Sequence, residues 1–161
     1  MFRDDDLTLR PLVPLAAWEG ELEAPPEGGE VWVVPEWVEE EFYRLNNLRF
    51  QIERLFAGVW GVRMDEEALA RAADAARALV RGSYLVAERA EAFRAALPAA
   101  GSFRLRRPGE AAVETAEGAL EALWALKRVW AQRWSLDEVI RRGAGGWPGP
   151  APVVVAIARK P

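Results

Sequence analysis

Three arginines stand almost side by side before a Pro-Gly turn, and their side chains could bind the oxygens of an anionic ligand. The segment 102–106 alternates apolar and polar residues and predicts a strand, so Arg104 and Arg106 should share one face. A guanidinium can fork onto phosphate oxygens with two hydrogen bonds. The sequence therefore predicts a phosphate or nucleotide site, with surface ion pairs as the alternative, at Arg104, Arg106 and Arg107.

Two missing residue types exclude several kinds of catalysis. The chain has neither cysteine nor histidine. Without cysteine it cannot form a disulfide, a thiolate metal site or a thiol nucleophile. Without histidine it lacks the commonest metal ligand and the usual general base at neutral pH. We therefore expect a non-catalytic protein with no catalytic residue and no metal site.

The acidic and glycine clusters give no specific signal. Asp4, Asp5 and Asp6 are adjacent, and on an extended chain their side chains alternate between faces and cannot converge on one ion. The glycine-containing segments 28–29 and 143–146 lack the Lys-Ser/Thr of a phosphate-binding loop and the GxGxxG spacing. We interpret them as a solvated terminus and as turns.

Eight tryptophans are many for 161 residues. Trp124, Trp130 and Trp134 fall on one predicted helix, and we expect them in the core. Trp147 stands between glycine and proline and should be partly exposed, where an aromatic side chain can contact a partner.

Four segments have the pattern of strands, namely 7–10, 31–34, 102–106 and 153–158. The last is a run of apolar residues typical of a central strand. One apolar stripe predicts a single long helix over residues 35–56, ended by Gly58 and Gly61. Further helices are expected over 65–80, with Asp65 as N-cap, over 86–97, and over 116–134, with Thr115 as cap. A short helical turn should follow at 135–142.

Composition indicates one α+β domain over residues 1–161, with a small sheet packed against about four helices. Apolar residues make up 51% of the chain and charged residues 29%, with a net charge of −4, which suits a folded protein. No apolar run could span a bilayer and no signal peptide is evident, so we expect no membrane partner and a cytoplasmic location. The 19 arginines against 2 lysines, with few Asn and Gln, suggest a thermophilic source.

The order of these elements over residues 25–158 resembles a known family. A loop and a strand lead into a long helix in the segment PPEGGEVWVVPEWVEEEFYRL. Two helices follow, and then the strand GSFRLRRPG. The next helix is EGALEALWALKRVWAQRWS, and the last strand is VVVAIARKP. This order is similar to the N-terminal lobe of the ATP-grasp (PEP/pyruvate-binding) domain of phosphoenolpyruvate synthase and pyruvate phosphate dikinase. The resemblance implies half of an ATP-grasp domain, ATP as ligand, Arg106 at the phosphate-contacting arginine and Ala156 at the hinge glutamine.

The sequence departs from that family at the motifs that carry out the family's chemistry. The glycine-rich Gly-Gly-Lys-Gly loop has no match in the first thirty residues, and Arg107 and Pro108 replace the Ser-Ser that follows the arginine. The second lobe, which carries the Mg²⁺-binding acids, and the phosphohistidine domain have no counterpart. The resemblance thus implies a degenerate, truncated lobe, and we do not expect phosphoryl transfer by this chain alone.

Three functions follow from these observations. The first is a non-catalytic interaction or regulatory module with a protein partner or a second copy of itself. The alternative is a nucleotide- or phosphate-binding regulator that uses Arg104, Arg106 and Arg107. The third is a nucleic-acid accessory factor with Trp147 as a stacking platform, which the acidic net charge disfavours. We expect no cofactor in the first case and ATP in the second.

Overall fold

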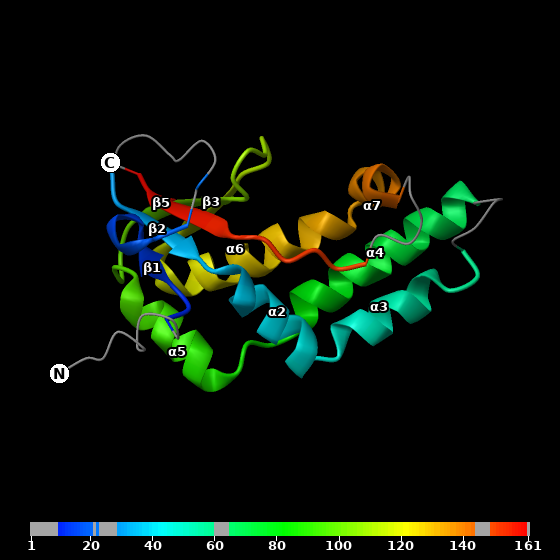
Figure 1. Ribbon diagram of the computed structural model, residues 1–161, viewed down its shortest axis with the longest axis horizontal. Helices are drawn as coiled ribbons and strands as arrows, with labels where there is room; N and C mark the ends of the chain where they lie inside the picture. Colours follow the sequence, from blue (N-terminus) through cyan, green and yellow to red (C-terminus); the bar gives the residue numbers. More distant parts are fainter. Residues whose placement is uncertain (1–9, 21, 23–28, 60–64, 144–148, 161) are drawn as a thin grey trace.

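The computed structural model describes residues 10–20, 22, 29–59, 65–143 and 149–160. The described part is an α+β fold with six α-helices and one five-stranded antiparallel sheet, which confirms the expected fold class. The sheet lies at one end of the molecule and most of the helices extend away from it (Figure 1). No helix in the described ranges is long and apolar enough to cross a membrane.

The strand that comes last in the sequence lies in the middle of the sheet. The spatial order is β1-β2-β5-β3-β4, with bounds Val13–Pro14, Val31–Val34, Val155–Arg159, Ser102–Arg106 and Glu114–Glu117. β5 pairs with both β2 and β3, and the register places Trp32, Ile157 and Leu105 in one row. This row belongs to the hydrophobic core, so one face of the sheet is buried against the helices. The prediction of a central C-terminal strand is confirmed.

Two expectations about strands and caps are wrong. Arg10, the only described residue of the predicted strand 7–10, lies in no strand, and the chain instead enters the sheet at β1. Thr115 does not cap a helix but pairs with Arg104 as part of β4. Helix α6 (Gly118–Ala131) therefore begins two residues later than predicted. Gly118, at φ 81°, makes the sharp turn from strand to helix in a conformation that favours glycine.

The predicted long helix 35–56 is two helices, α2 (Glu36–Leu45) and α3 (Leu48–Phe56). Asn47 is left-handed at φ 51° and breaks the helical path. Asn46 holds the break through contacts far away in the sequence, because its amide donates to the carbonyl oxygen of Tyr84 at 2.9 Å and its side-chain oxygen accepts from the Tyr84 N–H. The apolar stripe continues through both helices, which is why periodicity alone did not reveal the break.

The remaining helices lie close to their predicted positions. They are α4 (Glu66–Gly82), α5 (Ala87–Ala96) and α7 (Leu136–Arg142). The predicted cap of α4 is confirmed, since the Asp65 carboxylate accepts from the backbone N–H groups of Glu67 and Ala68. Ser135 caps α7 in the same way.

Helix α6 supplies the centre of the core. It ends in a 3₁₀ turn, η2 (Gln132–Trp134), and Trp130 and Trp134 are fully buried, as predicted. Trp130 stacks at 4.9 Å from Phe42 of α2. Trp124 was expected in the core but is 51% exposed. The buried stripe of α6 runs through Leu126 and Trp130, and Trp124 falls on the opposite side of the helix.

The left-handed residue between α2 and α3 gives the first testable prediction. Asn47→Gly should leave the free energy of unfolding close to the wild-type value, because glycine adopts positive φ without a steric penalty. Asn47→Val should lower it by about 1–2 kcal/mol, since a branched side chain is strained in this conformation. Urea denaturation measures both. Arg49→Val, at an exposed position inside α3, is the matched control and should cost only a few tenths of a kcal/mol. Equal losses at positions 47 and 49 would contradict the interpretation.

Candidate functional site

The sheet separates the three arginines that the sequence placed together. Arg104 is exposed and Arg106 is partly exposed, and both lie on the outer face of β3, as their spacing predicted. In the register of the sheet they pair with Ala158 and Ala156 of β5. Arg107 is only 2% exposed and lies on the core side. Arg104 and Arg106 therefore form one group and Arg107 belongs to another.

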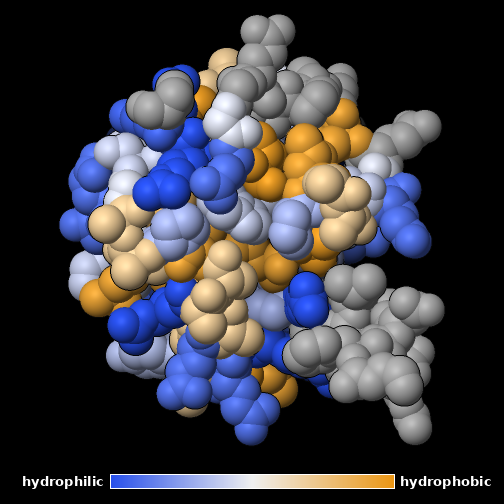
Figure 2. All heavy atoms as spheres, turned by 90° about the vertical axis from the view of Figure 1, so that its left-hand side faces the viewer, coloured by the Kyte–Doolittle hydropathy of each residue, from blue (hydrophilic) through white to orange (hydrophobic). Residues whose placement is uncertain are grey.

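The outer face of the sheet differs at the two arginines, because Arg104 is exposed whereas the residues in the row of Arg106, Ala156 and Val33, are buried. The sheet end of the molecule shows hydrophobic residues between groups of hydrophilic ones (Figure 2). Neither Arg104 nor Arg106 lines any of the three grooves of about 300 to 360 Å³ that the described residues form elsewhere. Arg104 in particular is surrounded by solvent, where a single ion pair contributes little.

Arg107 lies among side chains that sequence reasoning missed. One of its terminal nitrogens donates to the carbonyl oxygen of Trp130 at 3.3 Å. Its Nε and its other terminal nitrogen have no hydrogen-bond partner in the described part of the chain. Glu39, Arg133 and Arg142 are close enough to interact with one another or with Arg107 electrostatically. We call these four residues the charge cluster: Glu39, Arg107, Arg133 and Arg142.

Each member of the charge cluster comes from a different element. Glu39 is on the first turn of α2, one residue after the core residue Val38. Arg107 follows the last residue of β3. Arg133 is in η2 and Arg142 ends α7. The packing of α2 against the end of α6, seen in the contact between Phe42 and Trp130, brings these elements together.

Glu39 is the one acidic member, and it is 2% exposed. Burial raises the pKa of Glu39 from the usual 4.5 to about 7, although Arg107, Arg133 and Arg142 act in the opposite direction. The backbone N–H of Val153 donates to this carboxyl group, and Oε2 has no partner among the described residues. At neutral pH the group is therefore divided between its neutral and its charged form.

A polar pair beside the cluster fixes two of the surrounding elements. Trp134 donates its indole N–H to the hydroxyl oxygen of Tyr43 at 2.6 Å. Burial, and then Glu39, raise the pKa of Tyr43 above its usual range, so the phenol stays neutral. The guanidinium of Arg142 lies 5.0 Å above the Trp134 ring and donates to the carbonyl oxygens of Gly149 and Arg133. Arg142 is thus held in place before any ligand arrives.

Carboxyl groups outside the charge cluster also act on its guanidiniums. Besides Glu39, which is only partly ionised at neutral pH, Glu110 acts to raise the pKa of Arg107 and Glu138 acts to raise that of Arg142. Burial lowers the pKa of Arg107, Glu39 opposes this change and Arg133 adds to it. Burial lowers the pKa of Arg142 as well, with Arg133 again adding to the effect. Arginine nevertheless remains protonated in proteins, so all three guanidiniums carry a positive charge.

The cluster reaches solvent at Arg133 and Arg142, which are only partly buried. A groove of about 300 Å³ lies nearby on the other side of Tyr43. Its lining residues are Glu40, Tyr43, Arg44, Asn47, Arg49, Pro150 and Pro152. Tyr43 therefore contributes to both the groove and the surroundings of the cluster.

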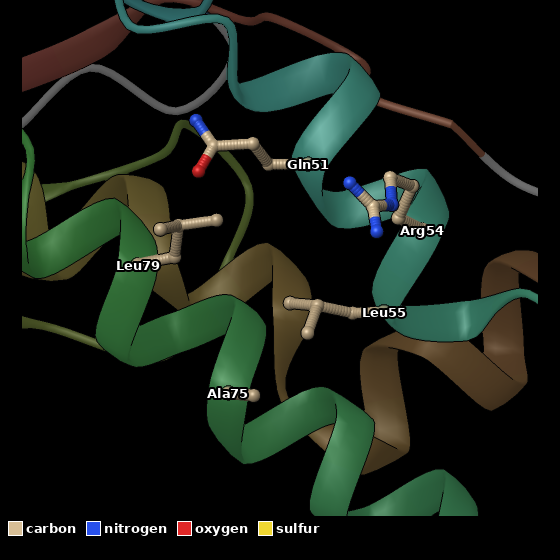
Figure 3. A pocket seen from close by; sticks show the side chains of 5 residues that line it. All are labelled: Gln51, Arg54, Leu55, Ala75 and Leu79. Carbon is tan, nitrogen blue, oxygen red and sulfur yellow. The ribbon is translucent and has the colours of Figure 1, made fainter.

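A second groove, of about 350 Å³, lies between α3 and α4 (Figure 3). Leu55, Ala75 and Leu79 form its apolar wall. The amide nitrogen of Gln51 donates to the carbonyl oxygens of Asn46 and Asn47. Gln51 is thus engaged with its own chain segment, and the guanidinium of Arg54 is the other polar group that lines this groove.

Several predicted features lie outside the described residues, among them Asp4–Asp6, Gly28, Trp147 and most of the segment 143–146. Within the described ranges no three acidic side chains gather in a way that could hold a metal ion.

The sequence contains an indication that Glu39 lies next to the core. It adjoins Val38 and precedes Tyr43 by four residues, so it borders the buried stripe of its helix. Acidic residues in the first turn of a helix also stabilise its N-terminus, and this common role accounts for Glu39 without burial.

No protein-family model matches the sequence, and no curated protein matches it either. The resemblance to an ATP-grasp lobe stays a prediction.

The raised pKa of Glu39 predicts a pH-dependent stability. Between pH 4.5 and 7 the native state holds a proton that the unfolded chain releases, so the Glu39 contribution to stability falls as the pH rises through this range. Glu39→Gln keeps the shape and removes the titration. From pH 5 to pH 8 the free energy of unfolding of Glu39→Gln should rise relative to wild type by about 2–3 kcal/mol.

Urea denaturation at both pH values measures this difference. Glu40→Gln is the matched control, because Glu40 is the next residue on the same helix and is exposed. Its difference from wild type should be the same at both pH values. If Glu39→Gln behaved like Glu40→Gln, Glu39 would not titrate near neutrality.

Proposed function

We propose that this protein is a non-catalytic regulatory module that binds a small anion of the phosphate class at the charge cluster. The observation that carries the proposal is the buried guanidinium of Arg107, which has two nitrogens without a partner among the described residues. Inorganic phosphate and the phosphate groups of a nucleotide share the chemistry that this site recognises.

The energetics of burial support an anionic ligand. A buried charge that lacks a hydrogen-bonding partner is costly, on the order of several kcal/mol. Glu39, Glu110 and Glu138 act electrostatically on the guanidiniums, but within the described ranges no carboxylate is hydrogen-bonded to the two unpartnered nitrogens of Arg107. A phosphate oxygen could accept from Arg107 and from Arg133 or Arg142, and charge-assisted bonds of this kind are roughly twice as strong as neutral ones.

This proposal changes the predicted site in one respect. Arg107 remains, while Arg133 and Arg142 take the place of Arg104 and Arg106. The two new members are partly exposed, unlike Arg107. The resemblance assigned the phosphate contact to Arg106, so substitutions at positions 104 and 107 distinguish the two sites.

A protein-interaction module is the second candidate, because large aromatic side chains are exposed. Tyr84 is 79% exposed and Trp124 51% exposed. Binding of nucleic acid loses its support, since Arg107 does not share a surface with Arg104 and Arg106.

Phosphate titration followed by thermal unfolding tests the anion site. Saturating inorganic phosphate should raise Tm, and ligand at about a hundred times Kd stabilises by about 2.7 kcal/mol, or roughly 5–10 °C for a chain of this size. Arg107→Lys and the milder Arg142→Gln should abolish the saturable part of the shift. Arg104→Gln, on the outer face of the sheet, is the control and should respond like wild type.

Sodium chloride at equal ionic strength serves as the salt control, and ATP without metal tests whether a nucleotide is preferred. No saturable shift in wild type would refute the proposal. Loss of the shift in Arg104→Gln but not in Arg107→Lys would return the site to the outer face of the sheet.

The proton on Glu39 should be coupled to anion binding. The neutral form of Glu39 leaves more net positive charge, so phosphate should bind more tightly at pH 6 than at pH 8 when compared at equal concentration of the dianion. Glu39→Gln should remove this dependence and bind more tightly than wild type at pH 8. Isothermal titration calorimetry in buffers of different ionisation enthalpy would also reveal proton uptake by wild type. An equal pH dependence in both proteins would contradict the coupling.

A further inference from the structure

A segment without helix or strand precedes β5 and contacts the charge cluster at two points. We call residues 149–154 the strap. Arg142 donates a terminal nitrogen to the carbonyl oxygen of Gly149 at 2.7 Å. The backbone N–H of Val153 donates to the carboxyl group of Glu39. The strap runs as an extended coil from β5 toward the helical end of the molecule (Figure 1), and it therefore joins the charge cluster to the central strand.

The buried position of Arg107 requires that something moves before an anion can bind to it. Its Nε and one terminal nitrogen are out of contact with solvent, and the whole residue is 2% exposed. A charge-assisted hydrogen bond from a guanidinium needs an acceptor at about 2.7–2.9 Å. We take the proposed binding of an anion at the charge cluster as the starting point and ask which covering segment opens.

The strap is held less firmly than the other elements around the charge cluster. Helix α2, the turn η2 and helix α7 each bury an apolar residue close to their member of the cluster, namely Val38, Trp134 and Val139. Every residue of the strap is partly or fully exposed. Segments with few buried apolar contacts open at the lowest cost in free energy, so the strap should open before the helices do.

The sequence of the strap suits a movement as one stiff unit. Gly149 has φ 61°, which favours glycine, and the space beside it is open, so the backbone can rotate there. Pro150 and Pro152 fix their own φ angles and favour an extended conformation in the residues before them. At the other end Val155, the first residue of β5, is fully buried in the sheet. The strap is therefore a rigid segment between a glycine pivot and a fixed strand.

From these contacts we infer that the strap closes the charge cluster when no anion is bound and that an anion displaces it. The anion replaces the carbonyl oxygen of Gly149 at Arg142 with an oxygen of higher negative charge, which is the stronger acceptor. The same movement takes the Val153 N–H away from Glu39. Opening thus exchanges two hydrogen bonds of the strap for hydrogen bonds between the anion and the guanidiniums.

Displacement of the strap also changes the groove of about 300 Å³ beside Tyr43. Pro150 and Pro152 line this groove together with residues from α2 and α3. When the strap moves, the groove loses this wall, whereas Tyr43 stays fixed by the hydrogen bond from Trp134. The anion would then control the shape of a neighbouring surface, which is how a regulatory module passes on the presence of its ligand.

Amide hydrogen exchange followed by NMR, with and without inorganic phosphate, tests the movement. At saturating phosphate the Val153 amide should exchange about tenfold faster, because its acceptor is lost, while the amide of Ile157 in β5 exchanges at the same rate or more slowly. The phosphate-dependent rise in Tm shows separately that the anion binds. A rise in Tm with unchanged or slower exchange at Val153 would overturn the strap mechanism and leave the anion site intact. An absent rise in Tm would refute the anion site, and the strap mechanism with it.

Val153→Pro removes the N–H that ties the strap to Glu39 and leaves every side chain of the charge cluster in place. This variant should bind phosphate roughly threefold or more tightly than wild type, because the apparent Kd falls as the open fraction rises. Ala151→Pro, at an exposed position of the strap, is the matched control and should bind like wild type. The gain should persist in the Glu39→Gln background, where this carboxyl no longer titrates. Equal affinity of the two proline variants, both folded by circular dichroism, would contradict the role of the strap.

Discussion

The burial of Glu39 beside Arg107 is the constraint on which the arrangement of this protein depends. Helix α2 must place a carboxyl against the end of β3, and the end of α6 must bring Arg133 to the same point. Bringing ionisable groups together out of water is unfavourable unless they compensate one another. The stacking of Phe42 on Trp130 and the hydrogen bond from Trp134 to Tyr43 supply the surrounding packing that holds them there. The resulting site is ordered but electrostatically incomplete, which is a property expected of a binding site.

The sequence patterns predicted a helix or strand correctly where that element depends on residues close to it in the sequence. The cap at Asp65 and the alternation in 102–106 each involve neighbours in sequence, and the expected helix and strand are present. The predictions were wrong where a contact with a distant segment decides which element forms. The break at Asn46 depends on Tyr84, and β4 forms because β3 offers it an antiparallel partner. Neither partner can be identified from the nearby residues, and for this reason the predictions of one long helix and of a cap at Thr115 were wrong.

The sequence also predicted the local features of the candidate site but not its contacts between distant segments. Spacing on a strand predicted that Arg104 and Arg106 share a face, and it also implies that Arg107 points the other way. Treating three adjacent arginines as one cluster ignored this second consequence. Glu39, Arg133 and Arg142 could not be assigned to Arg107 from the sequence, because they come from elements that meet only in the folded chain. Arg107 is the one residue of the predicted cluster that remains in the proposed site, and its neighbours there come from other elements.

Helix α6 connects the charge cluster to the centre of the core. Val129 and Trp130 are fully buried just before η2, and Arg133 follows within η2. The carbonyl oxygen of Trp130 also accepts the hydrogen bond from Arg107. Because the same helix end fills the core and holds both arginines, the position of the charge cluster depends on core packing, and a substitution that shifts the end of α6 would move Arg107 and Arg133 together.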